Sequence, residues 1–239
     1  MVSVDVLIRG FPGRSSYGYL GWSAVVLLTS GPEKVLVDTG AHGMRPVLLQ
    51  RLKERGIEPD DITLVVLTHT HWDHSHNAPL FKKARTLVHE IEMEYASTGR
   101  DLMVPEGLLD VLTSGGRLET VKGEPEILSG VQMIRTPGHT PGHVSLVVQG
   151  EEPTILAADG LKNRQEFLTG TAEMTLDPEA TAESITRISE IGGIVVPGHD
   201  RPFRVCDGHA TYLEPAEAEI FVATSPFRGE GSSFRLTLS

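Results

Sequence analysis

The feature that most restricts the fold of this chain is a set of short apolar segments that each end in a histidine or an aspartate. The apolar, β-branched run 62–67 has the length of a buried strand and leads directly into residues 68–74, Thr-His-Thr-His-Trp-Asp-His. Three more apolar runs end at His139, Asp159 and His199. Such residues converge when their strands lie in one layer or in facing layers, which predicts buried sheet covered by helices.

The segment 68–74 carries three imidazoles and one carboxylate in a single loop. Side chains two residues apart in extended backbone point to the same face, so His69 and His71 are expected to share one metal. Asp73 and His74 follow where the chain turns away, and they can bind a second metal. Imidazole and carboxylate are ligands that Zn²⁺ accepts. The alternative is a chance clustering of histidines on a solvated loop.

The remaining patterns predict alternating strands and helices in a single α/β domain over residues 1–239. We expect strands at residues 2–9, 22–28, 34–37, 62–67, 86–88, 130–135, 144–148, 154–158 and 194–196, and helices at residues 44–52, 91–95, 108–112 and from Asp177 onward. Asn77 is a candidate helix cap. The weakly patterned region 90–125 is expected to form a wall of the substrate pocket. Residues 206–239 are expected to form a C-terminal hairpin extension that covers the sheet or contacts another subunit.

The composition indicates a soluble cytoplasmic protein with a small-molecule substrate. A net charge of −11 and the lack of a basic stripe argue against a nucleic-acid partner. No apolar run approaches the roughly 20 residues of a membrane span, and the N-terminus lacks the features of a signal peptide. The single cysteine, Cys206, excludes an internal disulfide framework and fits a reducing cytoplasm. A homo-oligomer is left open.

Five motifs resemble, in order and spacing, those of the metallo-β-lactamase superfamily of binuclear hydrolases: Asp38-Thr-Gly, the segment 68–74, Thr136-Pro-Gly-His139, Asp159 and Gly198-His199. The resemblance covers about residues 35–200. It implies an α/β fold of the αββα four-layer sandwich type, with the metals at one edge of the paired sheets. It also implies one metal held by His69, His71 and His139, a second held by Asp73, His74 and His199, a bridging Asp159, and a non-ligand His143.

Among the branches of this superfamily, the N-acyl-homoserine lactonases are similar around residues 137–146, 177–179 and 198–200. They place a tyrosine three residues after the bridging aspartate, where this chain has Lys162. Glyoxalase II enzymes are similar in the loop 68–74, and animal metallo-β-lactamase-domain proteins are similar around residues 195–205. With Asp159 present, Cys206 is expected to be a core residue without a catalytic role. Asp38 is expected to orient a ligand histidine or to serve as a turn-former.

The predicted function is a metal-dependent hydrolase that cleaves a small ester or lactone with a hydroxide shared by two divalent metals. Zinc is favoured, and iron and manganese are alternatives. Asp73 or Asp159 is expected to pass a proton to the leaving group, and Lys162 to stabilise an oxyanion unless it is a solvated loop lysine. Phosphodiester or glutathione-thioester hydrolysis is a second reading, and a non-catalytic metal-binding or sensor protein is a third. The remaining histidines are assigned to the surface or to packing: His42, His76, His89 and His209.

Overall fold

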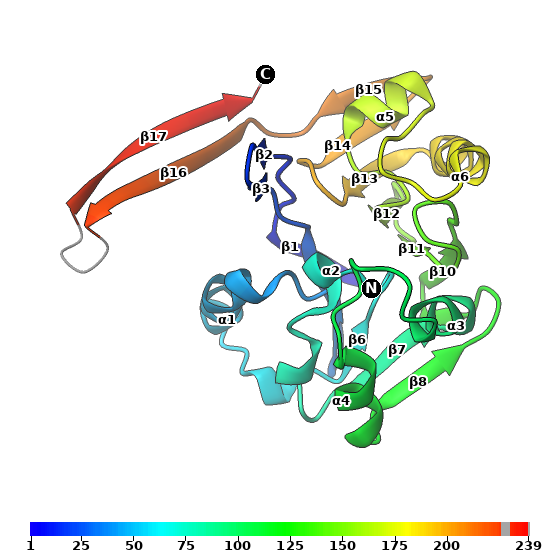
Figure 1. Ribbon diagram of the computed structural model, residues 1–239. Helices are drawn as coiled ribbons and strands as arrows, with labels where there is room; N and C mark the ends of the chain where they lie inside the picture. Colours follow the sequence, from blue (N-terminus) through cyan, green and yellow to red (C-terminus); the bar gives the residue numbers. More distant parts are fainter. Residues whose placement is uncertain (226–229, 239) are drawn as a thin grey trace.

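The computed structural model describes residues 1–225 and 230–238, and these form two large β-sheets that face each other (Figure 1). The first sheet has the strand order β1 (Ser3–Ile8), β4 (Val25–Ser30), β5 (Glu33–Val37), β6 (Leu64–Val66), β7 (Arg85–His89) and β8 (Leu118–Val121). The second has the order β15 (His209–Tyr212), β14 (Phe203–Cys206), β13 (Gly193–Pro197), β12 (Thr154–Ala158), β11 (Val144–Val148), β10 (Val131–Arg135) and β9 (Glu126–Leu128).

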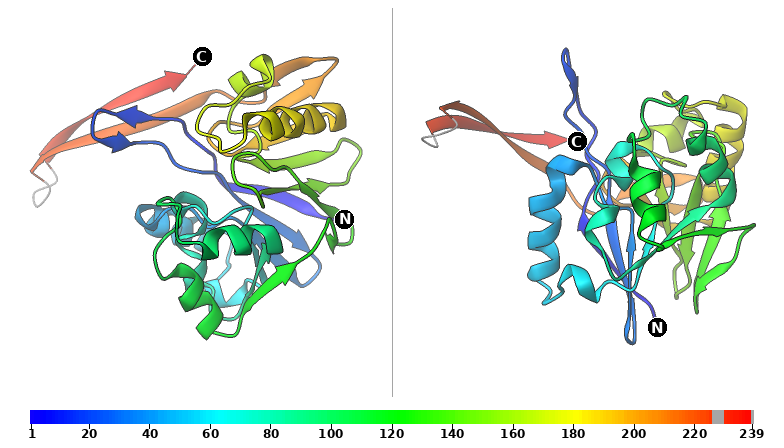
Figure 2. Two further views of the ribbon diagram at one scale, coloured as in Figure 1. Left: turned by 45° about the vertical axis from the view of Figure 1, so that its right-hand side comes forward. Right: turned by 60° about the horizontal axis from the view of Figure 1, so that its bottom comes forward.

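Helices cover the outer faces of both sheets, which gives the expected αββα order of layers. In the right-hand view of Figure 2, α1 lies outside the first sheet and α6 outside the second. The helices are α1 (Arg45–Lys53), α2 (Trp72–Ser75), α3 (Glu90–Ser97), α4 (Leu108–Ser114), α5 (Arg164–Thr169) and α6 (Pro178–Ile191), with short 3₁₀ turns η1 (His42–Met44), η2 (Pro59–Asp61) and η3 (Ala78–Leu80).

The apolar strands are buried on both faces because each faces a helix layer on one side and the other sheet on the other. In β4, Leu27 packs in the cluster beneath α1, whereas Val26 and Leu28 pack in the cluster between the two sheets. A third cluster joins the second sheet to Ile185 and Ile188 of α6. This double burial explains why the strands read as continuous apolar runs rather than as alternating ones.

Parallel pairing brings the predicted site residues to one edge of the sandwich. Strands β5, β6, β7 and β8 pair in parallel in the first sheet, and β12 pairs in parallel with β13 in the second. Asp38 and the loop 68–74 follow the carboxyl ends of β5 and β6, and Asp159 and His199 follow those of β12 and β13. Neighbouring parallel strands end at the same edge, so these residues become neighbours.

Most of the expected elements are present, with two differences in the local assignments. Asp177 caps α6 as predicted, since its side chain accepts hydrogen bonds from the backbone N–H groups of Glu179 and Ala180. Asn77 occupies the N-cap position of the short helix η3, but its side chain forms no capping hydrogen bond: the amide instead donates to backbone carbonyls, including that of Ala41 at 2.7 Å. The hairpin β2–β3 (Arg14–Ser15, Gly18–Tyr19) lies in a segment whose glycine, serine and tyrosine content is typical of a loop or a surface hairpin, and strands β8, β9 and β14 are present where no strands were expected.

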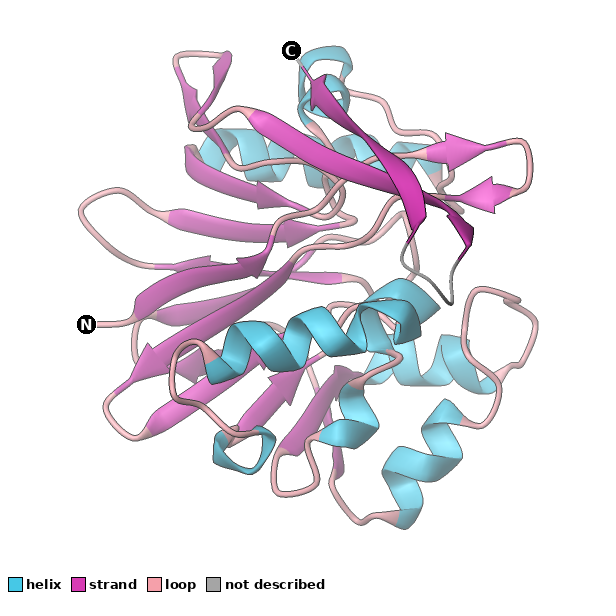
Figure 3. Ribbon diagram, turned by 90° about the vertical axis from the view of Figure 1, so that its left-hand side faces the viewer, coloured by secondary structure: helices cyan, strands magenta, loops and turns pink. Residues whose placement is uncertain are grey.

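The last two strands stand apart from the sandwich. Strand β16 (Ala216–Ser225) pairs only with β17 (Glu230–Leu238) in the described part of the chain, in a separate two-stranded sheet. Figure 1 shows this hairpin projecting from the body on the side of α1, and in Figure 3 it lies in front of the sheets. Residues up to Tyr212, in contrast, extend the second sheet. None of the helices in the described residues has the length and apolar character needed to cross a membrane.

Candidate metal centre

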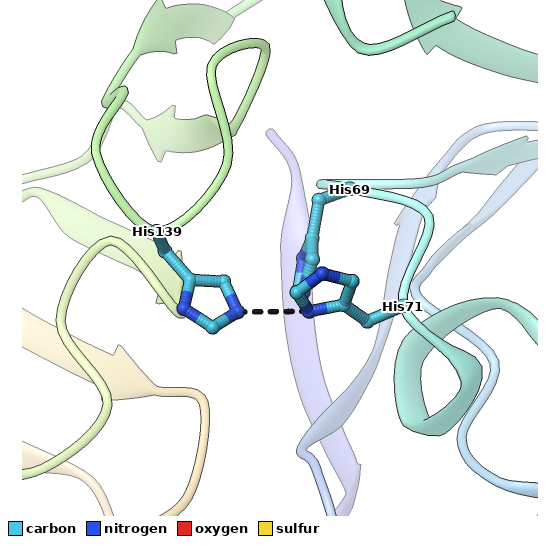
Figure 4. Close-up of side chains that lie close together, drawn as sticks. All are labelled: His69, His71 and His139. Carbon is cyan, nitrogen blue, oxygen red and sulfur yellow. Dashed lines mark hydrogen bonds between the residues drawn. The ribbon is translucent and has the colours of Figure 1, made fainter. Parts of the chain in front are cut away.

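The loop after β6 changes conformation between its two halves, as the sequence pattern predicted. His71 has extended backbone, and the short helix α2 begins at the next residue, Trp72. His69 and His71 therefore project from extended chain, whereas Asp73 and His74 project from a helical turn. The imidazole rings of His69 and His71 come together with that of His139 from the second sheet (Figure 4).

Two groups of side chains that share no member have the spacing of metal ligands, and a third group, His69, His74 and Asp159, overlaps both of them. One nitrogen each from His69, His71 and His139 lies within 4.8 Å of the others, and His139 Nε2 is 3.0 Å from His71 Nδ1. A second group of ligand atoms with the same spacing comes from Asp73, His74 and His199. Each group combines residues from both sheets.

Asp159 lies between the two groups. Its Oδ2 is 3.2 Å from His139 Nε2 in the first group. Its Oδ1 is 3.2 Å from His74 Nε2 and 3.3 Å from His199 Nε2 in the second group. One carboxylate oxygen therefore faces each group, which is the arrangement that a bridging ligand requires.

The polar atoms at the centre of this cluster lack hydrogen-bond partners within the described chain. His69 Nε2, His74 Nε2 and Asp159 Oδ1 are buried and form no hydrogen bond of regular geometry within the described chain, although His74 Nε2 and Asp159 Oδ1 lie 3.2 Å apart. Unpaired buried polar atoms cost free energy, and native proteins seldom retain them without a bound partner. The donor set of imidazole nitrogens and carboxylate oxygens fits divalent metal ions such as Zn²⁺.

The other ring nitrogens of three histidines are held by oxygen acceptors, which fixes which nitrogen faces the cluster. His74 Nδ1 donates to Asp38 at 2.7 Å, and His71 Nε2 donates to Asp101 at 2.9 Å. His139 Nδ1 donates to the backbone carbonyl of Met174 at 2.9 Å. An acceptor on the outer nitrogen orients the ring and makes the inner nitrogen a better ligand.

Asp38 thus orients a ligand histidine and does not serve only as a turn-former. Its carboxylate also accepts hydrogen bonds from the backbone and hydroxyl of Thr68, which opens the histidine loop. Its φ of 57° lies in the left-handed region, which aspartate tolerates better than most residues. Ala158, before Asp159, also has a positive φ of 44°. The backbone is therefore bent at two of the strand ends that carry site residues.

Asp101 and Glu92 support the site and were not identified in the sequence. Asp101 accepts a hydrogen bond from Tyr95 at 2.6 Å as well as from His71. The carboxylate of Glu92 is fully buried and accepts from the backbone and hydroxyl of Thr70 and from the hydroxyl of Thr140. Neither residue lies at the end of an apolar strand, so the pattern that located the ligands contained no signal for them.

His143 is buried beside the cluster without joining either group, consistent with the expected non-ligand role. Its Nε2 accepts a hydrogen bond from the backbone N–H of Asp159 at 3.1 Å, and its Nδ1 lies 2.8 Å from the hydroxyl of Thr136. Burial lowers the pKa of His143 well below its ordinary value, so the ring is neutral and can accept at Nε2. His143 therefore positions the backbone of the residue between the two groups.

Burial and the carboxylates set the charge of the clustered histidines. Burial lowers the pKa of His69 well below its ordinary value and that of His139 to about 4. At His74 burial acts in the same direction, but Asp159 and Asp38 outweigh it and hold the pKa well above the ordinary value. His69 and His139 are therefore neutral at pH 7, the form in which imidazole binds a metal.

A cavity of about 560 Å³ opens onto the cluster and includes Lys162 in its wall. The side chain of Lys162 is only 12% exposed, and its Nζ forms an ion pair with Glu166 Oε1 at 3.0 Å. The alternative of a solvated loop lysine is therefore wrong. Burial raises the pKa of Glu166, and the neighbouring ammonium group of Lys162 acts against that rise. The backbone carbonyl of Lys162 accepts from the N–H of His199 at 2.7 Å.

The remaining sequence assignments divide between the cavity and the surface. Met103 lines the cavity, so part of the region 90–125 forms its wall, and Tyr19 of β3 also lines it. Cys206 is exposed, so its expected place in the core is wrong; side chains alternate along β14, and Cys206 faces solvent while Phe203 and Val205 face the core. His42, His76, His89 and His209 lie outside both ligand groups.

Comparison with known proteins agrees with this geometry. A family model described as the metallo-beta-lactamase superfamily matches residues 20–212. Metallo-beta-lactamase domain-containing protein 1 of Mus musculus is 38% identical over 207 residues, which are 84% of this chain and 74% of that protein. N-acyl homoserine lactonase of Bacillus thuringiensis is 32% identical over 155 residues, which are 62% of this chain and 60% of that protein.

One solved structure shows where a related fold binds a small molecule. It is a variant of AiiA from B. thuringiensis with N-decanoyl-L-homoserine bound at its active site. It superposes with a TM-score of 0.67 at 23% identity and covers 83% of this chain and 92% of that one. At this identity the similarity establishes the shared fold.

Proposed function

The chain belongs to the metallo-β-lactamase superfamily of metal-dependent hydrolases, and we propose that it is a two-metal member that cleaves a small ester or lactone. The observation that carries this proposal is the position of Asp159 between two ligand groups. One of its oxygens faces His139 and the other faces His74 and His199. A site for a single metal does not need a carboxylate placed in this way.

In this proposal each group of side chains holds one divalent ion. His69, His71 and His139 hold the first, Asp73, His74 and His199 hold the second, and Asp159 bridges them. Zinc suits this mixture of imidazole and carboxylate ligands, and iron and manganese share the preference. When bound, such ions lower the pKa of water towards 7 and polarise the carbonyl oxygen of the substrate.

The residues around the metals would then handle the proton and the substrate. Asp73 or Asp159 passes a proton to the leaving-group oxygen, since both carboxylates lie inside the cluster. Lys162 donates from the cavity wall to a substrate oxygen and stabilises the negative charge that develops there. Glu166 holds the ammonium group in place for this role.

The cavity supports a small organic substrate. Its volume of about 560 Å³ is in the range of small-molecule sites. Tyr19, Trp72 and Met174 give it an apolar side, and Lys162 gives it a cationic one. The net charge of −11 disfavours a polyanion such as RNA. The similarity to a protein named N-acyl homoserine lactonase favours a lactone, and the single cysteine favours a cytoplasmic location.

The decisive experiment measures metal content and turnover on the same preparation. The panel contains a lactone, a carboxylic ester, a glutathione thioester, a β-lactam and a phosphodiester. We expect about two metals per chain and turnover of the lactone or the ester. Replacing the bridging carboxylate in Asp159→Asn should lower kcat/KM by at least about a hundredfold. Asp207→Asn, at the exposed turn between β14 and β15, is the matched control.

Each other result contradicts part of the proposal. Turnover of only the thioester or the phosphodiester would show that the proposed substrate class is wrong, while the proposed metal site would stand. Two bound metals without any turnover would favour a metal-binding or sensor protein. Fewer than one metal per chain after zinc, iron and manganese have been supplied would overturn the metal centre itself.

The role of Lys162 has a separate test. Lys162→Met keeps most of the side-chain volume and removes the ammonium group. We expect kcat to fall by about 10²–10³-fold with little change in KM, because an oxyanion donor acts mainly in the transition state. Unchanged kcat with normal metal content would show that Lys162 is only a partner of Glu166.

A further inference from the structure

A second cavity, separate from the metal centre, lies between the end of β1, helix α1 and the segment after β13. Its volume is about 570 Å³, and it shares no lining residue with the cavity at the metal centre. Four arginines line it, Arg9, Arg51, Arg55 and Arg201, and none of its lining residues in the described chain is acidic. We propose that this cavity binds a small organic anion with a carboxylate or phosphate head and a flat apolar body.

Arg201 is the residue that supports an anion in this cavity. It is only 6% exposed, its Nε is buried, and within the described chain this atom has no hydrogen-bond partner. No described carboxylate forms an ion pair with it; its guanidinium lies 3.6 Å from the centre of the Tyr212 ring. Arginine cannot lose its proton to escape a buried site, so burial of the charge is costly unless an anion pairs with it.

The other three arginines are more exposed and already paired with carboxylates. Arg9 pairs with Glu214 at 3.0 Å, Arg51 pairs with Glu54 at 3.0 Å, and Arg55 pairs with Asp5. None of these carboxylates lines the cavity. The carboxylates offset the charges of these three arginines, so Arg201 is the arginine of the cavity that remains available for direct contact with an anion. A guanidinium matches the planar oxygens of a carboxylate or phosphate with two parallel hydrogen bonds.

The apolar body of the ligand is inferred from the aromatic wall. The rings of Phe11 and Trp22 stack at 4.7 Å with an angle of 20° between their planes, and both residues line the cavity. Val47 of α1 also lines it and is 43% exposed. A purely inorganic anion would leave this apolar wall unused. The combination of one buried guanidinium and a stacked aromatic pair selects an aromatic or similarly flat organic anion.

The two tryptophans of the chain make the proposal testable without reference to the hydrolase activity. Trp22 lines the second cavity and Trp72 lines the cavity at the metal centre. In Trp72→Phe, the remaining tryptophan fluorescence therefore comes from the second cavity. The probes for this metal-loaded protein are phenyl phosphate, benzoate and phenol. They differ in whether the ring carries a phosphate, a carboxylate or a neutral head.

We expect saturable changes in Trp22 fluorescence with phenyl phosphate or benzoate and binding at least about tenfold weaker with phenol. The anion that binds more tightly identifies the head group. Because Arg201 is buried and Arg201→Gln can unfold the protein, Val47 supplies the decisive pair of variants. Val47→Glu adds a negative charge to the cavity and should weaken anion binding about tenfold or more, whereas the neutral Val47→Gln should change it less than about twofold.

Two results would overturn the proposal. One is a signal that rises linearly with probe concentration for both anions. The other is equal anion affinity in Val47→Glu and Val47→Gln, which would place the binding elsewhere. Neither result depends on whether the protein hydrolyses an ester, so failure of this proposal is distinguishable from failure of the proposed function.

Discussion

At the scale of single residues, the site depends on hydrogen bonds to the side of each histidine that faces away from the cluster. The acceptors are the carboxylate of Asp38 for His74, the carboxylate of Asp101 for His71 and the carbonyl of Met174 for His139. Each acceptor selects one tautomer, and the opposite nitrogen then faces the metal position. A change at an acceptor should therefore alter metal binding without removing a ligand.

Asp101→Asn tests this consequence. The amide oxygen can still accept from Tyr95, but the charge that holds the Nε2–H of His71 is lost. We expect metal affinity to fall by about 10–100-fold and kcat/KM at subsaturating metal to fall with it. Competition with a chelator measures the affinity directly. Asp110→Asn, at an exposed position of α4, is the control, and equal affinities in the two variants would contradict an orienting role for Asp101.

At the scale of elements, helix α3 connects two loops that come from different sheets. Its Glu92 accepts hydrogen bonds from Thr70 in the loop after β6 and from Thr140 in the loop after β10. The contact is close, since a Cβ on Gly142 would lie 2.0 Å from the backbone nitrogen of Glu92. A glycine is therefore required at position 142, and α3 sets the separation of His71 and His139.

Glu92→Gln should weaken this connection. The glutamine oxygen can accept the hydrogen bonds made by only one of the two carboxylate oxygens. The amide N–H groups that replace the other oxygen would face groups that donate a hydrogen bond to Glu92 in the native protein. We expect the free energy of unfolding to fall by about 1–3 kcal/mol, measured by urea denaturation. Glu94→Gln, on the exposed side of the same helix, should change it by less than about 0.5 kcal/mol. Similar losses in both variants would show that Glu92 has no special structural role.

At the scale of the whole molecule, the proposed metals would join the two sheets. The first sheet supplies His69, His71, Asp73 and His74, and the second supplies His139, Asp159 and His199. A ligand that binds only the folded state stabilises it by mass action. Metal at a hundredfold excess over its Kd adds about 2.7 kcal/mol to the free energy of unfolding.

Removal of the metal should therefore destabilise the entire sandwich. We expect dialysis against a chelator to lower Tm by about 5–10 °C, since 1 kcal/mol corresponds to about 2–4 °C in a protein of this size. Calorimetry before and after zinc is restored measures the effect and its reversal. An unchanged Tm together with complete metal loss would mean that the metals do not contribute to the stability of the sandwich.

Removal of the C-terminal hairpin is expected to leave the sandwich stable. We propose that the sandwich is one domain and that β16 and β17 are an extension to it. Because the described backbone of the hairpin pairs with neither large sheet, a chain ending at Pro215 should keep its Tm within about 2 °C and its metal content. A large fall in Tm would show that the hairpin covers the sandwich. Loss of an oligomer in size-exclusion chromatography would assign it to a subunit contact.

The sequence predicted the strands of the fold and the residues of the site to different extents. The apolar runs located the large-sheet strands β4, β5, β6 and β10 to β13, because double burial makes their sequences unmistakably apolar. The short strands β8, β9 and β14 were not predicted, since their sequences mix apolar residues with polar and charged ones. The candidate ligand histidines were identified from their positions at strand ends and from the family resemblance, whereas the ion pair of Lys162 with Glu166 depends on how the cavity wall folds.

By itself, the sequence determined the layered α/β fold and the residues that line its metal-binding edge, because burial and ligand chemistry restrict which residue types can occupy those positions. Only the tertiary structure decided which groups support them. Asp101 and Glu92 act through partners 22 to 48 positions away, and the residues that line the second cavity together with Arg201 come from the region of β1 and from α1. Such contacts leave no local pattern, because they depend on distances that exist only after the two sheets have packed.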